Sequence, residues 1–334
     1  MKYYLNNSYS QMQACSGGQV TLKCPEKLYL DITQDCNLYC RMCRDSLQAT
    51  GKTMPFDLFC RLVDETAPYV KCYSLYNWGE PLVVGDFRQR VEYVNAVKRP
   101  DCAVEISTNG MLLSDEMIGF LHTNGVDVIV SFDGADRETF EGIRCGSDFG
   151  RICNQLRKLA AAYAEKPPHR QPRIYTSIQR DNQGQLLKIA QLAHSLGIRR
   201  MGFGLVTSPL EYAPDMGEEL RAEIEETSAY LDSHKMLNDL YPTRVGDYLW
   251  WGNQYSYRDG FILDNRCNAP FVSATIAYNG DVFLCCNVGE FVGNVSDESF
   301  LALWQSGRYD DLRAAVNDGD AMPDRCRHCW WVNR

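Results

Sequence analysis

Three closely spaced cysteines are the residues of this chain best suited to chemistry. Cys36, Cys40 and Cys43 lie in the run Asp-Cys-Asn-Leu-Tyr-Cys-Arg-Met-Cys-Arg. Thiolates bind zinc or iron–sulfur clusters, and a structural zinc site closes its tetrahedron with a fourth Cys or His close by. No such residue occurs between Cys43 and Phe59. The spacing therefore predicts an iron–sulfur cluster with three protein ligands and one open iron.

A second set of cysteines lies near the end of the chain. Its members are Cys267, Cys285, Cys326 and Cys329, and the last two form a Cys-x2-Cys pair. Four thiolates suit a tetrahedral zinc ion or a closed iron–sulfur cluster, and both interpretations stay open on spacing alone. Either way, four ligands leave no open metal position for a reactant.

The composition excludes several classes of function. The chain has 334 residues, 45% of them hydrophobic, and a net charge of −9, which argues against a nucleic-acid partner. A small molecule or a peptide is the expected substrate. The first residues carry no apolar run suited to a signal peptide, and no stretch is apolar enough for a membrane span, so we expect a cytoplasmic protein. The odd count of 15 cysteines then indicates reduced thiols and metal sites.

Strand and helix patterns alternate through the first two thirds of the chain. The β-rich runs are 28–33, 72–77, 103–108, 126–132, 173–178 and 200–206. The helical patterns between them lie near 56–67, 86–98, 114–124, 149–164 and 184–196. Such alternation predicts an α/β fold with a parallel sheet, as an open, partial (β/α)6 barrel of the TIM type. A doubly wound sheet is the alternative. In both folds, ligands gather at the carboxyl ends of the strands. The first cysteine motif directly follows the first predicted strand and is therefore expected at this edge of the sheet.

The last third of the chain changes character. An acidic helix near 216–237 and an aromatic stretch form a predicted connector, and a β-hairpin follows over 273–285 with its turn at Asn279-Gly280. A helix is expected near 299–316. We therefore predict four segments: an N-terminal extension (1–26), a barrel (27–210), a connector (211–262) and a small hairpin-plus-helix domain (263–334).

The first cysteine motif resembles the signature of the radical S-adenosylmethionine (radical SAM) superfamily. In that superfamily, Cys-x3-Cys-x2-Cys binds a [4Fe–4S] cluster whose open iron chelates S-adenosylmethionine. The resemblance continues at Gly79, Glu80 and Pro81, similar to a Gly-Glu-Pro element, and implies that Glu80 holds the methionyl ammonium. Trp78 stands where the superfamily usually has a further glycine.

Later segments also resemble parts of the superfamily's cofactor site. Ser107 and Asn109 follow the third predicted strand, like a ribose-contacting segment, and Ser131 and Asp133 follow the fourth, like a segment near ribose and carboxylate. Two single residues complete the implied set. They are Arg144, whose guanidinium suits a carboxylate, and Met42, whose backbone matches an adenine-contacting position.

The second cysteine set resembles the superfamily's C-terminal auxiliary-cluster domains, called SPASM and, in shortened form, twitch. Cys285 ends a Gly-x4-Cys step of that kind, and only five residues follow Cys329. The resemblance implies one auxiliary [4Fe–4S] cluster that transfers electrons. Strand alternation places the neighbouring Cys286 on the opposite face from Cys285. Cys15 and Cys24 have no assigned role.

The resemblance implies an enzyme that receives an electron from a flavodoxin or ferredoxin and cleaves S-adenosylmethionine to a 5′-deoxyadenosyl radical, which removes a hydrogen atom from carbon. The single auxiliary cluster is most similar to twitch-type dehydrogenases of aminocyclitols such as 2-deoxy-scyllo-inosamine in antibiotic biosynthesis. The leading expectation is therefore a radical oxidoreductase acting on a sugar-, aminocyclitol- or nucleoside-like metabolite. The candidates near strand ends for facing the substrate are Tyr76, Gln179 and Arg180.

Three alternatives remain. The first is a maturase of ribosomally made peptides that epimerises residues or forms thioether links, although only 35 residues precede Cys36 to hold a leader-binding domain. An epimerase needs a hydrogen-donating thiol, for which Cys145, Cys153 and Cys286 are candidates. The second is a radical decarboxylase of a sugar acid. The third is a non-catalytic iron–sulfur or zinc protein.

Overall fold

The computed structural model describes residues 22–43, 51–206, 209–215, 217–240, 243–245, 248–250, 267, 269–286, 290–316, 318 and 320–327. These residues belong to two compact units. Those of 22–35, 51–105 and 267–327 form the first, and those of 36–43 and 106–250 form the second.

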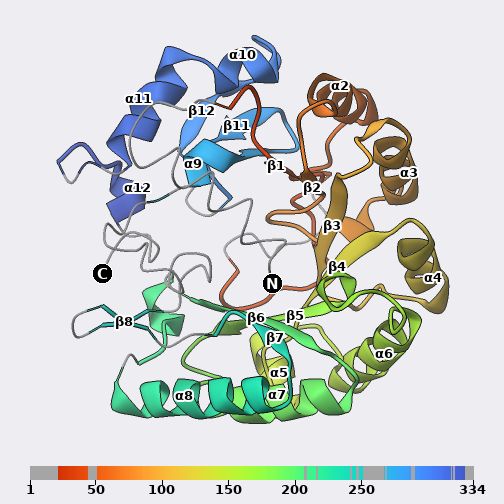
Figure 1. Ribbon diagram of the computed structural model, residues 1–334, viewed down its shortest axis with the longest axis vertical. Helices are drawn as coiled ribbons and strands as arrows, with labels where there is room; N and C mark the ends of the chain where they lie inside the picture. The colour runs from red at the N-terminus through yellow and green to blue at the C-terminus, as the bar shows by residue number, and fades with distance from the viewer. Residues whose placement is uncertain are drawn as a thin grey trace. The chain divides into compact units, whose positions relative to one another are not determined.

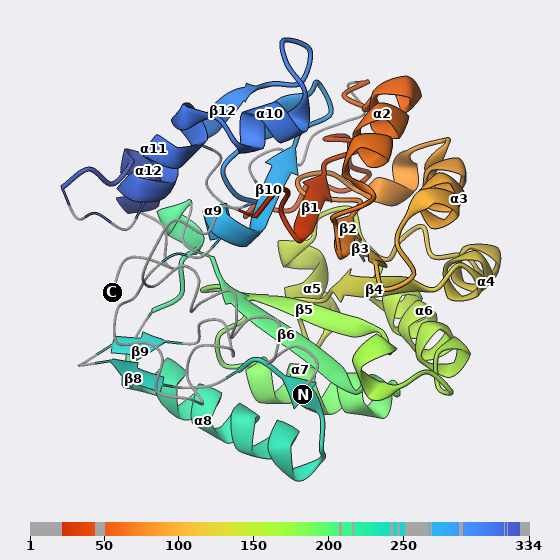
Figure 2. The same cartoon turned by 45° about the horizontal axis from the view of Figure 1, so that its top comes forward.

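The first unit contains a sheet with the strand order β12-β11-β10-β1-β2-β3. Strands β10, β1, β2 and the first half of β3 are parallel, and β11 and β12 add antiparallel strands at one side. Figure 2 shows β10 beside β1, although the two strands are far apart in sequence. The strands are β1 (Lys27–Leu30), β2 (Cys72–Ser74), β3 (Ala103–Thr108), β10 (Ser273–Ile276), β11 (Asp281–Phe283) and β12 (Phe291–Asn294). The helices are α2 (Phe56–Thr66), η1 (Pro81–Val83), α3 (Phe87–Val97), α9 (Ala269–Val272), α10 (Phe300–Trp304), α11 (Gly307–Ala315) and α12 (Asp324–Arg327).

The second unit contains four further parallel strands in the order β4-β5-β6-β7. They are β4 (Val126–Ser131), β5 (Arg173–Ile178), β6 (Arg200–Leu205) and β7 (Leu237–Asn238), and a separate hairpin pairs β8 (Thr243–Val245) with β9 (Tyr248–Trp250). The helices are α4 (Asp115–Thr123), α5 (Arg137–Ile143), α6 (Phe149–Ala162), η2 (Pro168–Arg170), α7 (Leu186–Ser195), η3 (Leu210–Tyr212) and α8 (Glu218–Ser233). Helices α7 and α8 lie side by side in both views (Figures 1 and 2).

Alternating burial explains why these segments form strands. In β5, Ile174, Thr176 and Ile178 are fully buried, whereas the residues between them are half-buried. Alternation with period two is the signature of a strand whose two faces meet different surroundings. Polar side chains cap the start of some helices: Ser114 accepts from Met117 N–H at the start of α4, and Asp148 accepts from Arg151 N–H at the start of α6.

The predicted α/β class with a parallel sheet is confirmed, and each of the six predicted strands is present. The hairpin turn is also confirmed: β10 and β11 are antiparallel, and Gly280 has φ of +87°, a conformation that favours glycine. Two expectations were too coarse. The helix expected near 299–316 is divided at Ser306, which caps α11, and the short α5, β7 and β12 were not predicted. The residue limits of the four predicted segments stay predictions.

Candidate functional site

The loop of the first three cysteines is held by backbone hydrogen bonds within the second unit. Tyr39 N–H donates to the carbonyl of Cys145 and Arg41 N–H to that of Ile143, both at 3.1 Å. These bonds fix the segment between Cys36 and Cys43 against the turn that follows α5. The position of the thiols is thus set by α5, an element that the sequence did not predict.

Two polar side chains lie against the thiols. Asn109 Nδ2 lies 3.8 Å from the sulfur of Cys36, and Arg144 Nη1 lies 3.9 Å from that of Cys40. Both are donors, and Arg144 is a cation, so both favour the thiolate form that binds iron. Burial raises the pKa of Cys40 to about 11, although Arg144 opposes this shift. Metal binding must therefore release the proton of this thiol.

Arg144 is held in turn by Asp133. The two groups form an ion pair of 2.6 Å, and Asp133 also accepts from Ser177 N–H at 2.7 Å. Both side chains are buried. Burial raises the pKa of Asp133 above its usual value even though Arg144 acts in the opposite direction. The structure thus brings together four of the predicted site residues, Cys36, Cys40, Asp133 and Arg144, and Asn109 lies against the same loop.

In the first unit, Gly79 and Glu80 pack against the strand end that leads to the cysteine loop. Glu80 N–H donates to the carbonyl of Asp35 at 2.9 Å. A Cβ at position 79 would lie 2.7 Å from that same carbonyl and closer still to the carbonyl of Thr33. Only glycine permits this approach. Glu80 is 2% exposed and caps the 3-10 turn that starts at Pro81 by accepting from Leu82 N–H.

The remaining predicted residues are placed as follows. Ser107 is the penultimate residue of β3 and Ser131 is the last residue of β4; both are half-buried, as is Met42. Arg180 is exposed, and its N–H donates to the carbonyl of Tyr212. Gln179 follows β5 and is fully buried. The functional roles predicted for all these residues stay predictions.

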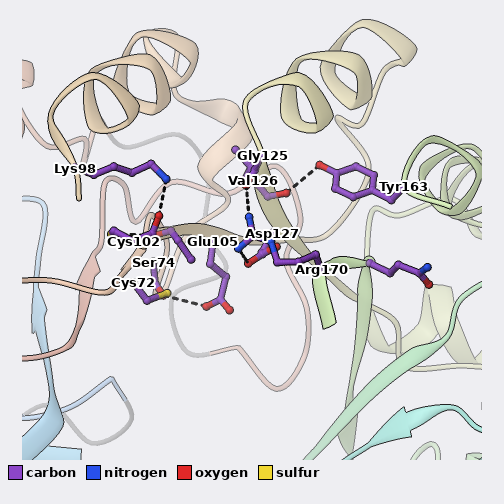
Figure 3. Close-up of polar contacts among 12 residues, drawn as sticks. Cys72, Ser74, Lys98, Cys102, Glu105, Gly125, Val126, Asp127, Tyr163 and Arg170 are labelled. Atoms are coloured by element: carbon purple, nitrogen blue, oxygen red, sulfur yellow. Dashed lines mark hydrogen bonds and ion pairs between the residues drawn. The ribbon is translucent and has the colours of Figure 1, made fainter. Parts of the chain in front are cut away.

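Tyr76, predicted to face the substrate, belongs to a polar cluster that the sequence did not reveal. Its hydroxyl donates to Glu105 Oε1 at 3.1 Å, and the same oxygen accepts from Lys27 at 2.8 Å. Ser74 also donates to this oxygen, at 3.0 Å (Figure 3). These side chains come from three adjacent strands of the first unit. This cluster forms a polar strand face in the first unit. The sequence signals were limited to Glu105 inside the β-rich run 103–108 and Lys27 directly before the run 28–33.

The second cysteine set is described in part. Cys285 and Cys326 are buried and Cys267 is half-buried, whereas Cys329 lies outside the described residues. Helix α11 contacts the segments that carry two of these thiols: Tyr309 donates to the carbonyl of Leu284, and Arg313 donates to that of Pro270. The guanidinium of Arg313 lies 4.2 Å from the ring centre of Trp304 and 4.1 Å from that of Tyr309. No local pattern in the sequence predicts these supporting side chains.

The other cysteines differ in their surroundings. Cys24 is buried, and burial followed by the nearby Glu65 raises its pKa well above the usual value, as expected for an inert thiol. Cys286 is half-buried, and burial raises the pKa of its thiol to about 11. Cys15 lies outside the described residues.

The donor set of the second unit fits an iron–sulfur cluster. Soft thiols would provide the ligands, and the donors of Asn109 and Arg144 would compensate the negative charge that a cluster with thiolate ligands carries. Within the described ranges, no three His, Cys, Asp or Glu side chains converge as a single metal ion would require.

Comparison with known proteins identifies the family. Residues 267–330 match the SPASM model, an iron–sulfur cluster-binding domain. The mycofactocin maturase MftC of Mycobacterium tuberculosis is 30% identical over 314 residues, which cover 89% of this chain and 75% of that protein. The chain belongs to the radical SAM enzymes with a SPASM domain.

Solved structures show the same fold for this radical SAM protein. SuiB of Streptococcus suis, solved with S-adenosylmethionine, has a TM-score of 0.69 and 15% identity, covering 97% of this chain and 76% of SuiB. BtrN, solved with AdoMet and 2-DOIA, has a TM-score of 0.51 and 15% identity, covering 91% of this chain and 92% of BtrN. The predicted partial barrel with a C-terminal auxiliary domain is therefore confirmed, as are S-adenosylmethionine and iron–sulfur clusters as cofactors. No helix in the described part of this radical SAM protein is long and apolar enough to cross a membrane.

Proposed function

We propose that this radical SAM enzyme matures a ribosomally made peptide. The observation that carries the proposal is the similarity over 89% of the chain to a protein named a maturase, at 30% identity. SuiB, which shares the fold, has also been solved with a precursor peptide, SuiA. This favours the peptide alternative over the leading expectation from the sequence, which was oxidation of a sugar-like metabolite.

The roles of the described residues follow from their chemistry. Cys36, Cys40 and Cys43 hold the first cluster, and Arg144 offers a guanidinium to the carboxylate of S-adenosylmethionine. When bound, these cofactors supply a radical that removes a hydrogen atom from an unreactive carbon. Asp133 keeps Arg144 in place by the 2.6 Å ion pair, and Asn109 donates toward Cys36.

The C-terminal residues have a separate role in the proposal. Cys267, Cys285, Cys326 and Cys329 hold the auxiliary iron–sulfur site, which exchanges electrons during turnover. A flavodoxin or ferredoxin in the cytoplasm supplies the electron. Arg313 and Tyr309 fix two of the ligand-bearing segments through Pro270 and Leu284.

The test is an anaerobic assay with reconstituted enzyme, dithionite and S-adenosylmethionine. Synthetic peptides encoded by short reading frames beside the gene are offered as substrates, and 2-deoxy-scyllo-inosamine is offered in parallel. We expect 5′-deoxyadenosine together with a mass change in one peptide, both measured by liquid chromatography and mass spectrometry. Deoxyadenosine in one-to-one ratio with an oxidised aminocyclitol, and no altered peptide, would contradict the proposal and restore the oxidation of a sugar-like metabolite.

A further inference from the structure

Gln179 has a fully buried side chain whose hydrogen-bonding capacity is unused within the part of the chain that the structure describes. Its exposed fraction is 0%, and neither Oε1 nor Nε2 has a hydrogen-bond partner among the described residues. Nearly all buried polar side chains in proteins are paired, and an unpaired buried amide opposes folding. An uncompensated group of this kind calls for a specific reason.

The backbone of Gln179 is fixed firmly. Its N–H donates to Asn182 Oδ1 at 2.9 Å, and its carbonyl accepts from the N–H groups of Asn182 and Gln183 at 3.1 and 3.0 Å. The turn therefore determines where the side chain of Gln179 starts. The unpaired amide is not a consequence of a loose loop.

Asn182 shows that the same turn can satisfy a buried amide. It is also 0% exposed, yet its Nδ2 donates to the carbonyls of Asp133 and Ser177, and its Oδ1 accepts from Gln179 N–H. Two buried amides three residues apart thus differ in one respect. The side chain of Asn182 makes hydrogen bonds that stabilise the fold, whereas the side chain of Gln179 makes none with the described residues.

This turn adjoins the residues of the cofactor site within the second unit. Asn182 binds the carbonyl of Asp133, Ser177 N–H binds the carboxylate of Asp133, and that carboxylate pairs with Arg144. Arg144 lies beside Cys40. Gln179 therefore stands at the carboxyl end of β5, where parallel α/β folds bind their ligands.

The chemistry of the side chain indicates the ligand class. A carboxamide is neutral and offers one acceptor and one donor in the same plane. A secondary peptide amide offers the complementary pair. The charged groups of S-adenosylmethionine already have Glu80 and Arg144 as expected partners, which leaves Gln179 for the other reactant.

We propose that Gln179 binds a backbone amide of the peptide substrate and is a specificity-determining residue of the enzyme. This inference rests on the proposed function. On this inference, the unpaired amide lowers the stability of the free protein and forms hydrogen bonds in the complex with the peptide. Such a conflict between stability and function is common at binding sites.

The first test needs no substrate. Gln179→Met replaces the amide by an apolar side chain of similar length, and Asn182→Leu removes the paired amide. Because, among the described residues, only the side chain of Asn182 has hydrogen-bond partners, we expect the melting temperature to rise in the first variant and to fall in the second. Equal losses in both variants would show that Gln179 is already satisfied, and would overturn the inference.

The second test uses a peptide selected from a random mRNA-displayed library on the reconstituted holoenzyme. Each backbone amide of that peptide is replaced in turn by an ester, and its affinity is measured with wild type and with Gln179→Met. At one position we expect the ester to weaken binding about tenfold in wild type and not in the variant, as loss of one hydrogen bond implies. The affinity for S-adenosylmethionine should stay unchanged.

The outcomes separate the inference from the proposed function. If no selected peptide inhibits the turnover of the enzyme, this result contradicts the proposed function itself. A peptide that binds without any ester position coupled to Gln179 overturns only the inference. Weaker S-adenosylmethionine binding in Gln179→Met would also overturn it, by assigning the residue to the cofactor.

Discussion

Arg144 and Asp133 form a buried ion pair with 2.6 Å between Nη2 and Oδ2. The sequence separates them by 11 positions, and α5 lies between them. A buried pair adds little net stability because both charges lose their hydration, but removing one partner leaves the other charge uncompensated. The pair is better explained as a device that fixes the guanidinium beside Cys40 than as a source of stability.

The first prediction concerns this pair. Asp133→Asn should lower the free energy of unfolding by about 3 kcal/mol, since it leaves Arg144 buried without its counter-charge. Urea unfolding of the metal-free protein measures this loss.

The matched control for that variant is Asp127→Asn. Asp127 pairs with Arg170 at 2.8 Å, but both side chains are partly exposed (Figure 3). An ion pair of this kind contributes about 1 kcal/mol or less. Equal losses in the two variants would show that burial does not decide the role of Asp133.

Local patterns in the sequence were sufficient to predict most of the fold. The six strands and five helices of the alternating region follow from apolar periodicity, and the Asn279-Gly280 turn follows from backbone conformation. The pairing of β10 with β1 could not be predicted, because no local signal joins residues 27–30 to residues 273–276. Short elements such as α5 contain too few residues for a helical period of apolar side chains to be recognised.

The site was predictable only where a motif carries it. The cysteine spacing and the Gly-Glu-Pro element identified the family, and the structure brings Arg144, Asp133 and Cys40 together. By contrast, the Glu105 cluster and the stacking of Arg313 depend on side chains from separate strands and helices. Their contacts arise from tertiary packing, which spacing along one sequence does not encode.

The second prediction tests the two cysteine sets separately. Replacing Cys36, Cys40 and Cys43 together by Ala should remove about four irons and four sulfides per chain and abolish S-adenosylmethionine binding. The auxiliary site should keep its iron, because its ligands lie in another part of the sequence. Iron and sulfide analysis after anaerobic reconstitution gives both results. Loss of all iron in this variant would show that the two sites assemble together.

The third prediction concerns Gly79. Gly79→Ala places a Cβ 2.7 Å from the carbonyl of Asp35, so the chain before Cys36 must shift. We expect at least a tenfold loss in S-adenosylmethionine affinity, measured by equilibrium dialysis on reconstituted protein. Gly85→Ala is the control, since a Cβ there meets nothing within 4 Å. Unchanged affinity in Gly79→Ala would show that the backbone shifts to accept the Cβ without weakening S-adenosylmethionine binding.

The fourth prediction concerns the support of the auxiliary site. Arg313 is 6% exposed, stacks on two aromatic rings and bonds to the carbonyl of Pro270. Arg313→Met should cost about 2–3 kcal/mol and lower the share of protein that retains auxiliary iron. Arg308→Met on the same helix is the control: Arg308 is exposed, so its loss should stay within about 0.5 kcal/mol. Full auxiliary iron in Arg313→Met would assign Arg313 to packing alone.

The last prediction concerns Lys27 and Glu105, whose ion pair measures 2.8 Å between partly exposed side chains. A double-mutant cycle with Lys27→Met and Glu105→Gln should give a coupling free energy of about 1 kcal/mol, measured by urea unfolding.

The pH dependence of that coupling follows from the pKa of Lys27. Burial acts to lower this pKa, but the carboxylate of Glu105 together with Tyr29, Tyr76 and Cys72 outweighs burial, and the pKa lies well above the usual 10.5. A lysine whose pKa is raised on folding contributes its full stabilisation below the unfolded value and loses it only as the pH rises through the folded value. The coupling should therefore stay constant between about pH 6 and pH 9. A coupling that declines across this range would show that Lys27 loses its proton there, and that the polar strand face is held by the hydroxyl groups of Ser74 and Tyr76 instead.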